Sequence, residues 1–169
     1  MIKLYKPKIE DLWFREKLLN DKDTMSYNNA YGGTIPFPKE KWEEWYNRWV
    51  NVDEHERLYR YILNENKEFV GEASYHYDDN FKAHMVDVIV YSKFRKRGYG
   101  GEALLTLIEN AKRNGIKSLS DNIAIDNPAI TLFLNLGFKE EYRNDEFIMF
   151  KIIINWPFYL SNNKSLLKI

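Results

Sequence analysis

The sequence predicts a mixed α/β domain in which a mostly antiparallel sheet is flanked by helices. Three observations support this prediction: three β-prone stretches lie between short polar turns, a basic glycine-containing loop follows them, and an amphipathic helix follows the loop. A chain of 169 residues fits one domain. We therefore expect residues 1–155 to fold as a single domain and residues 156–169 to form a tail of unassigned structure.

The first fifty residues predict a short strand and two helices. Residues 2–6 alternate like a strand that stops at Pro7, and apolar positions over residues 9–19 indicate a helix followed by a polar stretch. A loop with glycine and proline separates this helix from the next one. The second helix is predicted by four aromatic residues at helical spacing, Trp42, Trp45, Tyr46 and Trp49.

The middle of the chain predicts an antiparallel meander. Residues 58–64, 69–77 and 85–91 read as strands, and the polar turns between them are short enough for hairpins. Residues 92–101 form a basic loop, after which a stripe of apolar side chains from 103 to 111 predicts a helix that ends near Gly115.

The last part of the domain predicts a strand, a short helix and a terminal hairpin. Residues 118–125 have the composition of a strand, and residues 128–136 suit a helix stopped by Gly137. The hairpin is expected from residues 138–142 and 147–154. The element order is therefore typical of a mixed sheet with helical connections.

Composition excludes several function classes. Lys and Arg balance Asp and Glu at 25 each, so neither nucleic acid nor an anionic membrane is an expected partner. The absence of cysteine excludes disulfides, thiolate metal sites and a cysteine nucleophile, and three isolated histidines predict no metal site. No signal-peptide pattern and no apolar run of membrane-spanning length is found, which predicts a cytoplasmic protein.

The basic loop is the most informative motif. It reads Arg95-Lys96-Arg97-Gly98-Tyr99-Gly100-Gly101 and lies between a strong strand and a strong helix. Glycines let backbone amides turn toward one point, and the helix dipole places partial positive charge there. The loop therefore suits a phosphate or pyrophosphate group.

Three interpretations of this loop compete. It could be a tight strand-to-helix turn, although that does not account for so many glycines and cations together. The spacing Gly98-x-Gly100-x-x-Ala103, with Asp121 downstream, also matches the dinucleotide fingerprint of an oxidoreductase. That fingerprint belongs to a parallel βαβ unit and starts at the strand end, whereas six residues intervene here after an expected meander.

The third interpretation rests on a family resemblance. The pattern Val90-x-x-x-x-Arg95-x-x-Gly98-x-Gly100 resembles the pyrophosphate-binding motif of the GNAT superfamily of acyl-CoA-dependent N-acetyltransferases. Residues 126–138, which contain Asn127, Phe133 and the Leu-Gly-Phe ending, resemble a second segment of that family. The two motifs cover about residues 85–138, and the predicted element order fits the GNAT fold.

The resemblance implies acetyl-CoA as cosubstrate and a direct transfer to an amine in a ternary complex. It implies that the strand before the loop splays from its neighbour, exposes backbone groups to the pantetheine arm and directs the Val90 amide toward the thioester oxygen. The cofactor-binding residues expected on this basis are Val88, Ile89, Val90, Arg95, Lys96, Arg97, Gly98, Tyr99, Gly100, Gly101, Asn127 and Phe133.

The sequence indicates the general acid and the general base less clearly than it indicates the cofactor-binding residues. Phe133 stands where many family members have a tyrosine that protonates the leaving thiolate, and phenylalanine has no proton to donate. A general base is expected among four residues of the central strands, Glu72, His84, Asp87 and Asp121, with Asp87 and Asp121 leading and Glu72 next. The loss of the tyrosine leaves open a CoA-binding module without turnover.

The partner expected for an enzyme of this kind is a small-molecule or peptide amine. The sequence does not identify it. An apolar run at residues 156–160 would suit a homodimer contact as well as a segment folded back on its own domain.

Overall fold

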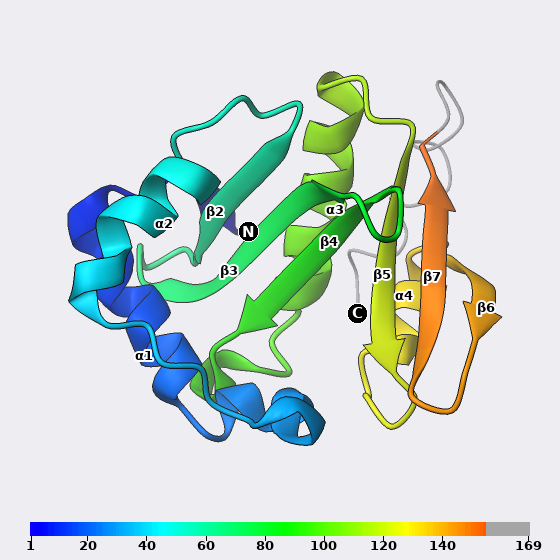
Figure 1. The fold of residues 1–169 in the computed structure, drawn as a ribbon, viewed down its shortest axis with the longest axis horizontal. Helices are drawn as coiled ribbons and strands as arrows, with labels where there is room; N and C mark the ends of the chain where they lie inside the picture. The colour runs from blue at the N-terminus through cyan, green and yellow to red at the C-terminus, as the bar shows by residue number, and fades with distance from the viewer. Residues whose placement is uncertain (155–169) are drawn as a thin grey trace.

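The computed structural model describes residues 1–154, except for the side chains of residues 29–31, and shows one seven-stranded mixed sheet (Figure 1). The strand order is β1-β2-β3-β4-β5-β7-β6. Every neighbouring pair is antiparallel except β4 and β5, which are parallel. The strands are β1 Lys3–Tyr5, β2 Arg57–Leu63, β3 Phe69–Asp78, β4 Ala83–Val90, β5 Ser118–Ala124, β6 Lys139–Arg143 and β7 Phe147–Ile153.

Helices cover both faces of the sheet. Helices α1 and α2 lie on one face, and α3 and α4 lie on the other (Figure 1). Their bounds are α1 Trp13–Asn20, α2 Trp42–Trp49, α3 Tyr99–Arg113 and α4 Ile130–Asn135. Short 3-10 turns cover Ile9–Leu12, Thr24–Tyr31, Lys39–Lys41 and Ser92–Phe94. The predicted mixed α/β fold is thus confirmed, and within the described residues no helix has the length and apolar character needed to span a bilayer.

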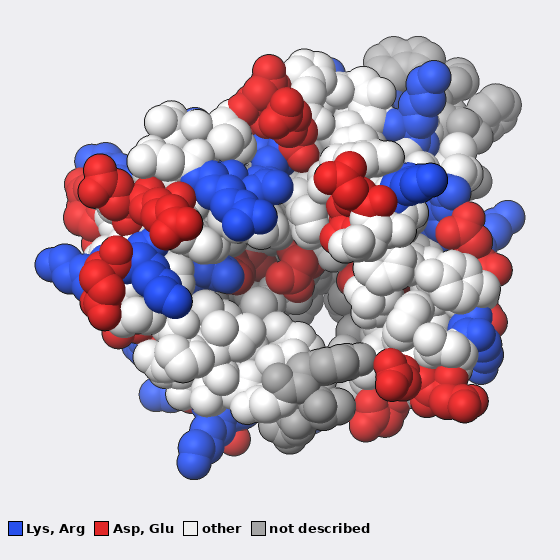
Figure 2. All heavy atoms as spheres, in the orientation of Figure 1, with Lys and Arg blue, Asp and Glu red and all other residues white. Residues whose placement is uncertain are grey.

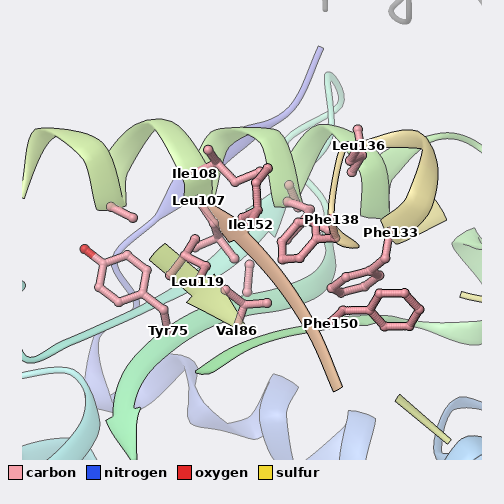
Figure 3. Close-up of a cluster of buried hydrophobic side chains, with 14 of the residues drawn as sticks. Tyr75, Val86, Leu107, Ile108, Leu119, Phe133, Leu136, Phe138, Phe150 and Ile152 are labelled. Atoms are coloured by element: carbon pink, nitrogen blue, oxygen red, sulfur yellow. The ribbon is translucent and has the colours of Figure 1, made fainter. Parts of the chain in front are cut away.

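The main core lies between α3 and the sheet. The apolar stripe of α3 is fully buried, with Leu104, Leu107 and Ile108 at 0% exposure. Figure 3 shows Leu107 and Ile108 directed toward Leu119 of β5 and Ile152 of β7. This packing explains why a helix predicted from periodicity alone is present, since removing one such buried leucine side chain costs about 2–5 kcal/mol.

The opposite face carries an aromatic core. Phe14 of α1 packs edge-on to Tyr61 of β2 with ring centroids 5.2 Å apart, and Trp45 of α2 packs edge-on to Tyr59 at 4.8 Å. The tryptophan stripe of α2 therefore packs against the sheet, as its helical period predicts. Trp45 remains only half-buried, so part of this aromatic layer borders open space.

One glycine is required by the close approach of two strands. A Cβ atom on Gly71 of β3 would lie 2.3 Å from the backbone oxygen of Ile89 in β4. No side chain fits there without moving one of the strands. Gly71 thus keeps β3 tight against β4, the strand on which the site described below is built.

Two elements differ from the sequence prediction. Thr24–Tyr31 forms 3-10 helix where only a polar stretch was predicted, and the Asp21 carboxylate stabilises its start by accepting a hydrogen bond from the Thr24 amide at 2.8 Å. Helix α3 begins at Tyr99, inside the predicted loop, because Gly98 adopts the left-handed conformation that lets the chain turn into the helix. The predicted tail at residues 156–169 lies outside the described residues.

Candidate functional site

The candidate site lies where β4 and β5 separate. These parallel neighbours share a single paired position, Met85 with Ser120, and then diverge toward their carboxyl ends. In the space-filling view of the same orientation, a hollow with acidic side chains at its floor occupies this gap (Figure 2). The chain thus contains an opening in the middle of an otherwise continuous sheet.

Backbone groups of β4 face this gap. The Tyr91 amide donates to the Val70 carbonyl at 2.9 Å, and hydrogen bonding to an antiparallel partner alternates along a strand. Ile89 therefore pairs with β3, whereas Val88 and Val90 direct their amide and carbonyl groups toward the gap. The Val90 carbonyl indeed accepts a hydrogen bond from Arg95 Nε at 3.2 Å, on the side away from β3.

The glycine loop lies directly beyond the end of β4. Gly98 has φ +83°, and a Cβ atom there would meet nothing within 4 Å, so the space next to it is open. The first amides of α3, including those of Tyr99 and Gly100, have no intrahelical acceptor by helix geometry. These amides and the helix dipole make the loop a fitting cradle for an anion.

The loop cations have different surroundings. Lys96 and Arg97 are exposed, and neither forms an ion pair with a described residue. The Arg95 guanidinium instead donates to the carbonyl oxygens of Asp23, at 3.1 Å, and Thr24, at 2.5 Å. Arg95 therefore ties the loop to the Thr24–Tyr31 segment, a role that its place in the motif does not predict.

Asp87 lies on β4 at the floor of the cleft. It is directly opposite Ser74 of β3 and on the face of the sheet covered by α1 and α2. The Asp87 side chain is solvent-exposed, although many protein atoms lie around the carboxyl group. Burial, together with the charge of Glu72, raises the pKa of Asp87 to about 6, against an opposing effect of Arg15. A carboxylate with such a pKa is a suitable proton acceptor near neutral pH.

Asp121 borders the gap from the other face. It lies two residues from each of the core residues Leu119 and Ile123 and therefore shares their face of β5, the side of the sheet that α3 covers. Burial raises its pKa well above the ordinary value, and the nearby charge of Asp87 raises it further. The structure thus brings the two leading base candidates close together, but only Asp87 is on the face with the aromatic layer.

Glu72 is occupied by other side chains. It is 3% exposed, forms an ion pair with Arg15 of α1 and accepts a hydrogen bond from the Tyr59 hydroxyl. The guanidinium contacts Oε1 and the phenol donates to Oε2, so both carboxylate oxygens are already occupied. Among the three candidates, Glu72 is therefore the one that anchors other groups of the site.

Three residues of the cleft are absent from the sequence-based list. Arg15 and Tyr59 hold Glu72. Tyr27, in the 3-10 segment, is 41% exposed and lies near enough to Asp87 and Glu72 for their charges, with the surrounding protein, to raise its pKa. Arg15 left a signal in the sequence: it lies three residues after Leu12 and three before Leu18, within the apolar stripe of its helix.

The second motif has mainly structural contacts. Asn127 Oδ1 accepts a hydrogen bond from the Ala129 amide at 2.9 Å, and the Asn127 carbonyl accepts one from the Ile130 amide at 3.2 Å, so Asn127 supports the start of α4. Phe133 is 5% exposed and packs against Phe138, with ring centroids 4.7 Å apart (Figure 3). Residues 1–154 contain no group of three His, Asp or Glu side chains placed to hold a metal ion.

Comparison with known proteins agrees with this geometry. The family model described as an acetyltransferase (GNAT) domain matches residues 2–139. The fold is similar to that of spermidine N-acetyltransferase from Vibrio cholerae in complex with CoA and spermine, with a TM-score of 0.73 and 17% identity over 90% of this chain and 95% of that one.

Two further solved structures show the same fold. An N-acetyltransferase from Staphylococcus aureus Mu50 has a TM-score of 0.71 and 19% identity over 92% of this chain and 99% of that one. The putative acetyltransferase yncA from Salmonella typhimurium, solved with acetyl-CoA, has a TM-score of 0.69 and 19% identity over 92% of this chain and 95% of that one.

Proposed function

The chain belongs to the GNAT acetyltransferase family, and on that premise we propose that it transfers the acetyl group of acetyl-CoA to a primary amine by direct attack. The observation that carries this proposal is the gap between β4 and β5, which opens directly onto the glycine loop at the start of α3. A strand edge with unpaired backbone groups followed by an anion cradle suits a long ligand that ends in a pyrophosphate.

The two sides of the cleft would hold different substrates. We call β4, the loop and the start of α3 the cofactor side, where Val88 and Val90 offer backbone groups to the pantetheine arm. On this side the amides of residues 95–101, with the exposed cations Lys96 and Arg97, would hold the pyrophosphate. We call α1, the Thr24–Tyr31 segment, α2 and the facing parts of β2 and β3 the acceptor side.

Asp87 is our assignment for the general base. An alkylamine with a pKa near 10.4 is neutral in only about one molecule in 10³ at pH 7. Asp87 would take the proton of the acceptor ammonium, directly or through a water molecule. The amine nitrogen then forms the new C–N bond with the acetyl carbon while the C–S bond breaks, and the electron pair of the C–S bond leaves with sulfur as the CoA thiolate. The nitrogen loses its second proton to this thiolate or to water, which gives the neutral amide and CoA.

The absence of a tyrosine at position 133 does not prevent this reaction. Thiols titrate near pH 8.5, so the sulfur can depart as thiolate without a protein acid. The Val90 amide, which points into the gap, would supply a hydrogen bond to the thioester oxygen as negative charge develops there. The side chain of Phe133 then needs only to support the core beneath the loop.

The test combines thermal unfolding with an activity screen. The protein is unfolded alone and with acetyl-CoA, CoA, NAD or NADP, and an amine panel is then monitored for free thiol. A ligand at about 100 times its Kd adds about 2.7 kcal/mol to the free energy of unfolding. We expect a shift with acetyl-CoA and CoA only, followed by amine-dependent thiol release.

The other outcomes would redirect the assignment. A shift with CoA but no thiol release from any amine would favour the non-catalytic CoA-binding module. A shift only with NAD or NADP would favour the dinucleotide interpretation of the loop.

A further inference from the structure

The acceptor side contains a cation that the proposed transfer does not use. Arg15 extends from α1 into this side, and 17% of its side-chain surface stays exposed. All of its side-chain hydrogen bonds come from Nη1, which donates to the Glu72 carboxylate and the Tyr59 hydroxyl. Among the described side chains neither Nε nor Nη2 has an acceptor, and because Nε is buried, Nη2 is the donor left for a ligand.

Aromatic rings hold this guanidinium in place. Its central carbon lies 4.4 Å from the centroid of the Trp45 ring, 5.3 Å from that of Phe37 and 5.5 Å from that of Tyr59. A guanidinium packed on rings and fixed by an ion pair loses little freedom when it binds a further anion. Arg15 is therefore preorganised to bind a carboxylate.

The distance from Arg15 to the proposed base suits a small molecule. Glu72, which Arg15 contacts, pairs with Ile89 of β4, and Asp87 lies two residues before Ile89 on the same face. Such diagonal neighbours in a sheet are about 7–8 Å apart. An anion bound to Arg15 would therefore lie only a few bonds from an amine placed at Asp87.

Resting on the acetyl transfer proposed above, we propose that the acceptor is an amino acid or a similar small amine with an anionic group, and that Arg15 binds this anion. The amine nitrogen then lies beside Asp87, and the aromatic rings of the acceptor side contact the remainder of the molecule. A linear polyamine has no group that accepts a hydrogen bond from the free Arg15 donor, so it would leave that donor unpaired. Arg15 is thus the specificity-determining residue of the acceptor side.

The first experiment needs only the wild-type protein. Initial rates with acetyl-CoA are measured for leucine, methionine and glutamate, for the carboxamide of each, for the amine left after removal of the α-carboxylate, and for spermidine. We expect kcat/KM to be at least about tenfold higher for the best acid than for its amide, mainly through KM. The amine of each carboxamide is less basic than that of the acid, so a larger fraction of it is neutral and reactive at pH 7. Intrinsic reactivity therefore favours the amides, and a preference for the acids must come from the protein.

The variant experiment removes the cation without leaving its partner charged. The double variant Arg15→Met with Glu72→Gln should lower kcat/KM for the acid by about ten- to hundredfold and change that of the amide by less than threefold. The control is Lys17→Met, which removes a lysine from the exposed side of the same helix. It should leave the ratio of acid to amide unchanged.

Each remaining outcome decides between the two proposals. Acetylation of spermidine or of the amides without preference for the acids would overturn the Arg15 assignment and leave the acetyltransferase proposal standing. If no amine is acetylated, binding of the acids in the presence of CoA is read from tryptophan fluorescence. Binding that the double variant loses would support the anion site without catalysis, and no binding would overturn it.

Discussion

The cofactor side and the acceptor side of the cleft are built from different chemistry. The cofactor side consists mainly of backbone atoms: the free edge of β4, the turn at Gly98 and the first amides of α3. The acceptor side consists of side chains from four distant segments, such as Arg15, Tyr27, Tyr59 and Glu72. One side depends on backbone conformation and the other on which residue occupies each position.

This difference explains what each side can recognise. Backbone amides at a helix start bind any phosphate of suitable shape, so a common cofactor can be held with few particular side chains. Recognition of an acceptor needs charged groups at defined places, and the charges of the acceptor side are of both signs. Substitutions on the cofactor side should therefore affect all acceptors equally, whereas those on the acceptor side should depend on the acceptor.

The largest expected effect comes from Asp87→Asn. Without the base, kcat/KM should fall by about 10²–10⁴, as measured by thiol release. The variant should also unfold at a higher temperature at pH 7. The folded pKa of Asp87 lies above the ordinary value, so its ionised form lowers stability. This cost develops as the pH rises from the ordinary value of 3.8 to about 6 and stays constant above that.

The control for this variant is Asp79→Asn, in the exposed turn between β3 and β4. It makes the same chemical change outside the cleft and should alter neither activity nor its pH dependence. The wild type should lose kcat/KM as the pH falls below about 6, where Asp87 becomes protonated. If Asp87→Asn still lost kcat/KM below about pH 6, the general base would be another group, and Asp121 would be the first to examine.

The single variant Arg15→Met should cost stability on the acceptor side. It leaves Glu72, 3% exposed, as a buried charge held only by Tyr59. Breaking one partner of a buried ion pair typically costs about 3–5 kcal/mol. Urea unfolding should show this loss, and the double variant with Glu72→Gln should recover most of it. Equal losses in both variants would mean that ring packing, and not charge pairing, dominates at Arg15.

Gly100→Val should weaken CoA binding without affecting the acceptor side. The new Cβ would lie 3.5 Å from Val90 Cγ2, an ordinary contact, so the fold should persist. Its methyl groups would occupy space beside the loop and raise the Kd for CoA by at least about 100-fold, measured by calorimetry. The control is Gly115→Ala at the other end of α3, where φ is +73°: it should cost about 1–2 kcal/mol of stability and leave CoA affinity unchanged.

The same contrast determines how much the sequence could predict. The three-strand meander, α3 and the mixed sheet follow from periodicity and turn residues. The glycine loop is recognisable in the sequence because the anion site proposed there needs glycine. Glu72, in contrast, reads as a candidate base until Arg15 is placed beside it, and these residues are 57 positions apart. The Thr24–Tyr31 segment has no apolar period in the sequence, and tertiary contacts of the buried residues Thr24 and Met25 hold its start in place. Side-chain networks of this kind depend on the folded structure.

The smallest expected effect concerns the connection between the two sides. The Ser92 amide donates to Thr24 Oγ1 and the Ser92 hydroxyl to the Asp21 carboxylate, each at 2.9 Å, so the start of the loop is fastened to the segment that carries Tyr27. Ser92→Ala removes the second bond and should cost about 1–2 kcal/mol of stability.

The kinetic consequence of this loss should fall on the acceptor side. Tyr27 lies within range of the charges of Asp87 and Arg15, whereas the amides of the loop remain in place. KM for the acceptor should therefore rise a few-fold, while the Kd for CoA changes by less than about twofold. Ser26→Ala, which removes an exposed hydroxyl that donates to the Asp23 carbonyl within the same segment, should change neither value. If Ser92→Ala instead lowered the affinities for CoA and for the acceptor equally, this contact would hold both sides together as one unit. Backbone recognition and side-chain recognition would then not be separate where the two sides meet.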